Sequence, residues 1–328
     1  MGREKLFGKE PANAAAIEVV RYAELQPCFD AFIDTRTPGS DKKENFTIIG
    51  PGVSENPNQY VHIARPHGFN IGGARQPPGC VNSQHSHDTA EFFYVHTGIW
   101  SFNLGESGED ASATLGPGDA ISIPTKTFRG FENIGEDTGF LFAVLGGDNP
   151  GRVTWAPYVF DMAEEFGLIL LDNGSLIDTA KGEAVPPGMN PMPRTSADQV
   201  AALRSFDAAA LRECCVMSDQ ALPGGMVNGV RRRQLVHPQG GLSWPHVFAV
   251  EELTLEPGGN VNLGSVSTPQ VVFAHRGSFS ISADSVHENL GYGDTATIAV
   301  GCARSLANTT DTPATALLVT GLPDAIAA

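Results

Sequence analysis

Two histidines and one glutamate in residues 79–98, GCVNSQHSHDTAEFFYVHTG, have types and a spacing suited to chemistry. His85 and His87 lie two residues apart, so on an extended strand both rings point to one face, and Glu91 returns to that face after a short bend. Such a set suits a divalent first-row metal with open coordination positions and is typical of non-haem iron(II). The alternative to a metal site is an ordinary polar strand edge. Considered by itself, a His-x-His spacing is more typical of such an edge than of a metal site.

The elements that must position these side chains read as short strands. Alternating or apolar runs of strand length follow one another from Tyr60 onward, separated by turns: YVHIA, GFNIGGA, AEFFYVHTG, IWSFNL, DAISIP and GFLFAVLGG. Between Trp155 and about Leu211 the pattern becomes partly helical, as in TSADQVAALRSF. Strand-like sequence then resumes at HVFAVEELTLEPGG. The pattern predicts two β-rich regions separated by a segment with short helices.

The second β-rich region repeats the first in diluted form. A shift of 179 residues lays Gly98 on Gly277, and a shift of 175 lays residues 116–133 on residues 291–308. Self-similarity of this kind indicates a duplicated structural unit. We therefore expect the same fold twice.

The residues around the two histidines resemble the first motif of the cupin superfamily at every spacing. That frame consists of Gly79, His85, His87, Glu91 and Gly98. The second cupin motif is matched by Gly118, Pro124 and Asn133. Two positions depart from it: Lys126 stands where a glycine is usual, and Arg129 stands where the fourth metal ligand, a histidine, would be.

This resemblance implies an all-β bicupin, with two antiparallel jelly-roll (cupin) barrels in one chain and a few short helices in the arm and linker. The expected domains are an N-terminal arm, residues 1–56, an N-terminal barrel with the metal site, 57–155, a helical and loop linker, 156–235, and a C-terminal barrel, 236–328. The metal ligands that the resemblance implies are His85, His87 and Glu91.

The second barrel should bind no metal. The positions of the histidines and the glutamate hold Gly264, Val266 and Gln270, and Arg304 stands in the position of the last histidine. Gln270 and Arg304 are thus the counterparts of Glu91 and Arg129.

Arg129 has two alternative roles, because a guanidinium stays protonated and can only donate hydrogen bonds. It can form a buried ion pair with Glu91 or Glu132, or it can present its fork to a carboxylate or enolate of a substrate on the metal. The arginine at position 304 supports a structural role shared by both barrels.

Further pocket residues follow from strand parity and from the position of Gln84 beside the first histidine. Phe93 and Val95 share the inward parity of Glu91, and Phe131 and Asn133 share that of Arg129. The alternative for Phe131 is an ordinary core position.

Composition restricts the partners and the compartment. The formal net charge of −16 opposes binding to nucleic acid or to an anionic membrane surface. The five cysteines show no C-x-x-C spacing, and no apolar segment follows the N-terminal charges, which predicts free thiols in a cytoplasmic protein.

Among bicupins, the resemblance is to ring- and diketone-cleaving dioxygenases of the gentisate and quercetin type. It implies a metal-dependent oxidoreductase for a small chelating carboxylate, phenolic or enolic substrate, with Fe(II) first among the metals and Mn, Ni, Zn or Cu as alternatives. A redox-neutral isomerase or lyase and a non-catalytic small-molecule-binding cupin are the other readings. Residues 1–56 offer a surface for homo-oligomerisation.

Overall fold

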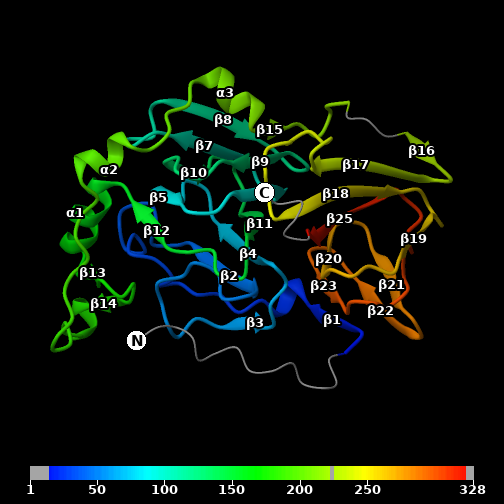
Figure 1. The fold of residues 1–328 in the computed structure, drawn as a ribbon, viewed down its shortest axis with the longest axis horizontal. Coiled ribbons are helices and arrows are strands. Elements are labelled where there is room, and N and C mark those ends of the chain that lie inside the picture. The colour runs from blue at the N-terminus through cyan, green and yellow to red at the C-terminus, as the bar shows by residue number, and fades with distance from the viewer. Residues whose placement is uncertain (1–14, 222–224, 323–328) are drawn as a thin grey trace. The chain divides into compact units, whose positions relative to one another are not determined.

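The computed structural model describes residues 15–221 and 225–322, which divide into two compact units. The first unit comprises Gln26–Val61 and Asn70–Gln220, and the second comprises Met1–Leu25, His62–Phe69 and Ala221–Ala328. Each unit is built from two antiparallel sheets (Figure 1). The prediction of an all-β chain with two similar units is confirmed.

The first unit holds a seven-stranded sheet, in the order β15-β9-β6-β11-β4-β2-β3, and a five-stranded sheet, β12-β5-β10-β7-β8. The strands of the larger sheet are β2 (Glu44–Ile49), β3 (Val61–Ile63), β4 (Phe69–Gln76), β6 (Glu91–Thr97), β9 (Ala120–Ile123), β11 (Gly139–Gly146) and β15 (Cys215–Val216). Those of the smaller sheet are β5 (Val81–His87), β7 (Trp100–Leu104), β8 (Ala111–Leu115), β10 (Arg129–Asn133) and β12 (Val153–Trp155). Phe93 of one sheet packs on Phe102 and Phe131 of the other, with ring centroids 5.3 and 5.2 Å apart.

The partly helical segment belongs to the first unit. It contains α1 (Pro157–Glu165), the hairpin of β13 (Leu168–Leu170) and β14 (Leu176–Asp178), the 3-10 turn η2 (Thr179–Lys181), α2 (Ala197–Ala201) and α3 (Ala208–Glu213). Ser196 and Gln199 form a capping box at the start of α2, and Asp207 caps α3. Val159 and Phe160 of α1 pack in one apolar cluster with Trp155 of β12.

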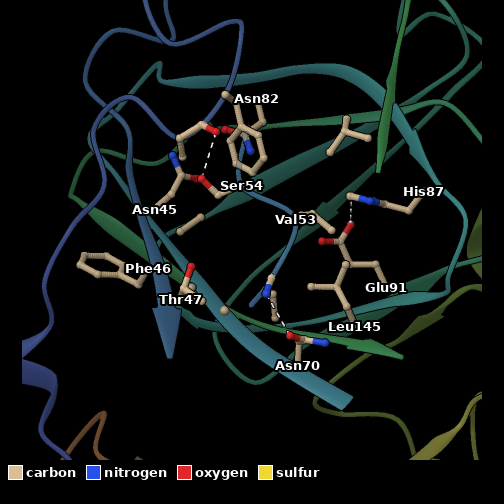
Figure 2. Close-up of a pocket in the computed structure, with 18 of the residues that line it drawn as sticks. Asn45, Phe46, Thr47, Val53, Ser54, Asn70, Asn82, His87, Glu91 and Leu145 are labelled. Carbon is tan, nitrogen blue, oxygen red and sulfur yellow. Dashed lines mark hydrogen bonds and ion pairs between the residues drawn. The ribbon is translucent and has the colours of Figure 1, made fainter. Parts of the chain in front are cut away.

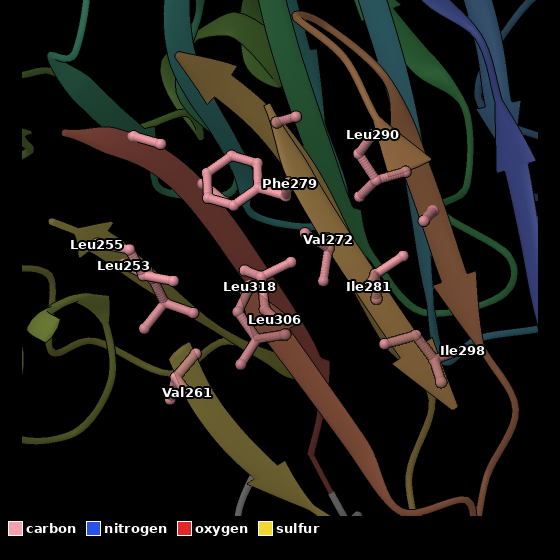
Figure 3. Packing of buried hydrophobic residues seen from close by; sticks show 14 of the residues in the cluster. Leu253, Leu255, Val261, Val272, Phe279, Ile281, Leu290, Ile298, Leu306 and Leu318 are labelled. Atoms are coloured by element: carbon pink, nitrogen blue, oxygen red, sulfur yellow. The ribbon is translucent and has the colours of Figure 1, made fainter. Parts of the chain in front are cut away.

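The second unit has a seven-stranded sheet, β1-β23-β20-β25-β18-β17-β16, and a four-stranded sheet, β19-β24-β21-β22. The strands of the larger sheet are β1 (Ile17–Val20), β16 (Met226–Val227), β17 (Val230–Val236), β18 (Phe248–Leu255), β20 (Gln270–Arg276), β23 (Thr295–Ile298) and β25 (Ala314–Gly321). Those of the smaller sheet are β19 (Asn260–Gly264), β21 (Phe279–Ala283), β22 (Val286–Leu290) and β24 (Arg304–Asn308), and the 3-10 turn η1 (Tyr22–Glu24) follows β1. Leu253, Val272, Phe279 and Leu306 meet in its apolar core (Figure 3).

Strand register matches the sequence repeat. Arg129 pairs with Leu104 in the first unit, and Arg304 pairs with Ala283 in the second, which are equivalent positions under the two shifts. The framing glycines Gly79 and Gly258 both have φ of 71°, a conformation that side chains with a Cβ rarely adopt. The duplication is therefore one of backbone geometry as well as of sequence.

Each unit is assembled from segments that are not consecutive in the chain. Of the predicted arm, residues 1–14 lie outside the described residues, β1 pairs antiparallel with β23 of the second unit, and residues 26–56 belong to the first unit. Residues 156–220 of the predicted linker also belong to the first unit. Hydrogen-bond pairing at sheet edges, which short stretches of sequence do not encode, sets these boundaries.

Candidate metal centre

His85, His87 and Glu91 come together inside the first unit. Strand β5 carries both histidines, and β6 begins at Glu91 after a short turn. One ligand atom from each residue lies within 4.8 Å of the others, and all three side chains are buried. Figure 2 shows His87 and Glu91 facing each other across this point, with Nε2 of His87 3.5 Å from Oε2 of Glu91. The distances suit one metal ion.

The ring of His85 is held in the form that a metal ligand requires. Its Nδ1 lies 2.7 Å from the carbonyl oxygen of Ser83, and because a carbonyl only accepts, this nitrogen carries the hydrogen and leaves Nε2 with a free lone pair. Burial, and next the charge of Arg129, lower the pKa of His85 to about 3. The ring packs between His87 and Trp155, with centroids 5.0 and 5.3 Å away.

His87 is the second neutral imidazole. Burial lowers its pKa well below the ordinary value, so the ring is uncharged at neutral pH. Its Nδ1 is buried without a hydrogen-bond partner among the described residues. An unpaired buried polar atom is costly. Two neutral imidazoles with an adjacent carboxylate form a donor set that a divalent cation accepts.

Arg129 occupies the position of the fourth ligand and binds Glu91. Its Nη2 donates to Oε2 of Glu91 at 3.0 Å, and its Nη1 donates to the carbonyl oxygen of Thr127 at 3.2 Å. The guanidinium is fully buried, and Arg129 is not among the residues that line the adjacent cavity. Of the two roles expected from the sequence, the ion pair is the one present in this structure, with Glu91 and not with Glu132 as the partner.

The second unit repeats this contact without the carboxylate. Nη1 of Arg304 donates to Oε1 of Gln270 at 2.9 Å, and its Nε donates to the carbonyl oxygen of Cys302 at 3.1 Å. In the part of the chain that the structure describes, no metal-binding cluster of histidine, cysteine and carboxylate side chains forms in this unit. The arginine is thus shared by both units, and the metal-binding set occurs in one.

A cavity of about 80 Å³ adjoins the three ligands. Phe93 and Phe131, two of the predicted pocket residues, line it, whereas Gln84, Val95 and Asn133 do not. Asn133 instead donates to the carbonyl oxygens of Gln76 and Asp137, and Gln84 donates to that of Asn103. The sequence did not point to several of the lining residues: Asn45, Thr47, Val53, Ser54, Asn70, Asn82 and Leu145, which Figure 2 labels, and Trp155.

Asn82 reaches the cavity because strand β5 is irregular. Arg129 pairs with His85 but Phe131 pairs with Asn82, so the register shifts between these two pairs. A β-bulge of this kind changes which side chains share a face. Simple alternation from His85 places Asn82 on the opposite face, so strand parity alone does not predict Asn82 as a cavity residue.

Residues of the predicted arm form buried hydrogen bonds to residues next to the candidate site. Asp34 forms a buried ion pair with Lys43 and accepts the backbone N–H of Ser83 at 3.0 Å, next to the carbonyl that orients His85. Glu55 accepts Nε1–H of Trp155 and the backbone N–H of Ile33, both at 2.7 Å. Burial raises the pKa of Glu55 to about 8.

Comparisons with known proteins agree with this geometry. Residues 74–145 match the family model described as "Cupin domain". The comparison with curated proteins gave no match.

Solved structures of oxalate decarboxylases share the fold. The Lactobacillus farciminis enzyme in its formate complex aligns with a TM-score of 0.60 at 11% identity, covering 93% of this chain and 86% of that chain. The Bacillus subtilis enzyme at pH 4.6 aligns with a TM-score of 0.56 at 14% identity, covering 93% and 76%. A further Bacillus subtilis structure, from a study of that enzyme's Mn(II) centres, has a TM-score of 0.56 at 12% identity, covering 93% and 77%.

The family match covers the segment that contains the metal-binding set, and the structural matches cover both units. The strand register shows that the second unit is a copy of the first. Residues 74–145 thus form a cupin domain, and the chain as a whole shares its two-unit fold with the oxalate decarboxylases.

Proposed function

We propose that this protein is a metal-dependent enzyme that catalyses a redox-neutral, lyase-type reaction on a small carboxylate in the first unit. The observation that carries the proposal is the buried set of His85, His87 and Glu91 beside a cavity lined mainly by apolar side chains. Support for a lyase comes from the fold shared with oxalate decarboxylases, and a decarboxylation removes CO₂ without net oxidation.

The size of the cavity favours a small substrate. About 80 Å³ is well below the typical volume of a pocket for a drug-sized ligand. Amide and hydroxyl groups of Asn45, Ser54 and Asn82 contribute to the wall. Apolar side chains make up most of the rest of the wall, so these groups are the ones available to the oxygens of a compact acid.

Each protein group has a defined task in this proposal. A bound divalent metal would supply Lewis-acid polarisation of a substrate carboxylate or carbonyl oxygen. His85, oriented by Ser83, and His87 and Glu91 would hold that ion. Arg129 fixes the carboxylate of Glu91 as a positioning residue. Trp155 and Phe93 line the cavity beside the ligands and limit the access of water.

For the metal, we propose Mn(II) in place of the Fe(II) that the sequence favoured. The support is the Mn(II) described for the Bacillus subtilis oxalate decarboxylase, which shares the fold. The donor set of two imidazoles and a carboxylate accepts either ion, so affinity alone does not select between them.

A dioxygenase remains the second candidate, because the 2-His-1-carboxylate set is typical of non-haem iron oxygenases. Oxygen uptake separates the two. A lyase should release CO₂ or another fragment at an unchanged rate under anaerobic and aerobic conditions without consuming oxygen stoichiometrically, whereas a dioxygenase should consume one O₂ per turnover.

The first experiment combines metal analysis with a substrate panel. Untagged protein should contain about one transition metal per chain, and His87→Ala should lose it, while the exposed His287→Ala should retain it. Metal-loaded protein is then assayed with short dicarboxylates and 2-oxo acids. Metal in the native chain with no turnover of any acid on the panel counts against the proposed reaction, and equal metal content in all three chains counts against the site. A non-catalytic binding cupin would keep its ligand affinity in His85→Ala.

A further inference from the structure

The charges buried around the metal centre are already balanced by the protein. Glu91 pairs with Arg129, and Asp34 pairs with Lys43, with all four side chains buried. Each of these two buried ion pairs is neutral as a whole, so the buried carboxylates are already balanced without any metal.

A histidine at position 129 would leave the charge of Glu91 available to a metal. With arginine there, a divalent cation adds two positive charges that no buried protein group offsets, and an uncompensated buried charge is strongly unfavourable. The same oxygen of Glu91 that lies 3.5 Å from His87 already accepts from Arg129 at 3.0 Å. The cation and the guanidinium therefore compete for one carboxylate.

The guanidinium is not free to leave. Arg129 donates to the carbonyl oxygen of Thr127, and Arg304 at the equivalent position donates to the carbonyl oxygen of Cys302. In the second unit the guanidinium keeps this place although its partner, Gln270, carries no charge. Backbone carbonyls therefore hold the arginine in position whether or not a carboxylate pairs with it, so its positive charge stays beside a bound metal.

We propose that Arg129 makes metal binding at His85, His87 and Glu91 depend on a small carboxylate dianion, so that metal and dianion bind together more tightly than either binds alone. Two negative charges in the adjacent cavity restore neutrality, and Nδ2 of Asn45, which lines the cavity and has no hydrogen-bond partner among the described residues, can donate to an outer carboxylate oxygen. The inference rests on the proposed function, since it assumes that the site takes a divalent metal.

Equilibrium dialysis at defined free Mn²⁺, with correction for complexes in solution, tests the coupling. Oxalate is the dianion probe and acetate the monoanion control. Native protein should bind Mn²⁺ at least about tenfold more tightly with oxalate than without, with a smaller change for acetate, and Mn²⁺ should raise oxalate affinity by the same factor.

Two variants assign the coupling to the charge at position 129. Arg129→Gln should bind Mn²⁺ more tightly than the native chain in the absence of anion, and its gain from oxalate should shrink. Arg304→Gln alters the equivalent buried arginine of the second unit and should bind Mn²⁺ as the native chain does. Circular dichroism should first establish that both variants are folded.

The outcomes separate this inference from the proposed function. Tight Mn²⁺ binding with equal affinity in the presence and absence of oxalate overturns the coupling and leaves a metal enzyme. An undiminished gain from oxalate in Arg129→Gln overturns the role of the arginine. Absence of Mn²⁺ binding in the native chain and in Arg129→Gln, with and without oxalate, overturns both proposals.

Discussion

At the scale of residues, an arginine in place of the usual histidine of the second cupin motif changes the electrostatics of the site. The fourth-ligand position holds Arg129, and the structure pairs it with a metal-binding carboxylate. The second unit has kept the arginine and has an amide, Gln270, where the first has Glu91. The same guanidinium contact is thus made to a charged carboxylate in the first unit and to a neutral amide in the second.

Glu91→Gln should separate metal binding from folding. Because Arg304 donates to a glutamine at the equivalent position, the amide oxygen should accept from Arg129, and the free energy of unfolding should change by less than the roughly 3–5 kcal/mol expected when a buried pair loses one partner. Metal affinity should fall by more than about 100-fold, since a ligand is lost. Urea unfolding and elemental analysis measure the two effects. Arg129→Leu, which leaves Glu91 buried and unpaired, is the destabilised comparison.

The metal-free protein should lose stability as pH falls below about 6.5. The pKa of His85 is lowered from 6.5 to about 3, so the unfolded chain binds a proton on this side chain that the folded chain excludes. The stability that this difference contributes is present above pH 6.5 and decreases through the window down to about 3. Between pH 6.5 and 5 the loss from His85 is about 2 kcal/mol. Urea unfolding of native protein and of His85→Gln tests this, and equal slopes in the two proteins would contradict it.

At the scale of elements, irregularities in the strands and turns decide which side chains face the cavity and where the backbone is strained. The register shift in β5 turns Asn82 to the face of His85, and the turn before β10 carries Lys126 at a φ of 58°. Lys126 stands where the motif usually has glycine, and the left-handed conformation explains that preference. Its side chain is exposed, so burial does not offset the strain of the left-handed backbone.

Lys126→Gly should therefore stabilise the first unit, by up to about 1 kcal/mol, because glycine adopts this backbone conformation without the strain of a Cβ. Metal content should be unchanged, since the lysine side chain points to solvent. Thermal unfolding measures the shift. Lys126→Ala, which keeps the Cβ, is the control and should show no such gain; equal stabilisation by alanine would rule out backbone strain as the cause.

At the scale of the whole molecule, chain order and spatial units differ. The N-terminal strand β1 completes the edge of the sheet in the second unit, and Asp294 accepts the backbone N–H of Tyr22 at 2.9 Å. In the first unit β15 takes the equivalent edge, and Asp119 accepts the backbone N–H of Ser218 at 2.7 Å. No helix among the described residues is long and apolar enough to cross a membrane.

Removal of residues 1–21 should destabilise the second unit, because it takes away a hydrogen-bonded strand and exposes the edge of β23. We expect a lower unfolding temperature and greater aggregation at high protein concentration, measured by calorimetry and light scattering. Removal of residues 1–14 retains β1 and is the matched control. The same light scattering on the native chain tests homo-oligomerisation: a monomer would remove that prediction.

The sequence by itself determined the fold class and the duplication, and it predicted the candidate metal ligands. Periodicity and framing glycines are local properties, so His85, His87 and Glu91 can be located from spacing along two adjacent strands. Two pocket residues, Phe93 and Phe131, followed from the same alternation. Only the tertiary structure decided the rest. The cavity wall includes Asn45, Ser54 and Trp155, which are far apart in the chain and meet because sheets bring distant segments together. The partner of Arg129 was equally undetermined, because two glutamates lay within reach in the sequence and only the packing of β10 against β5 and β6 places Glu91 beside it.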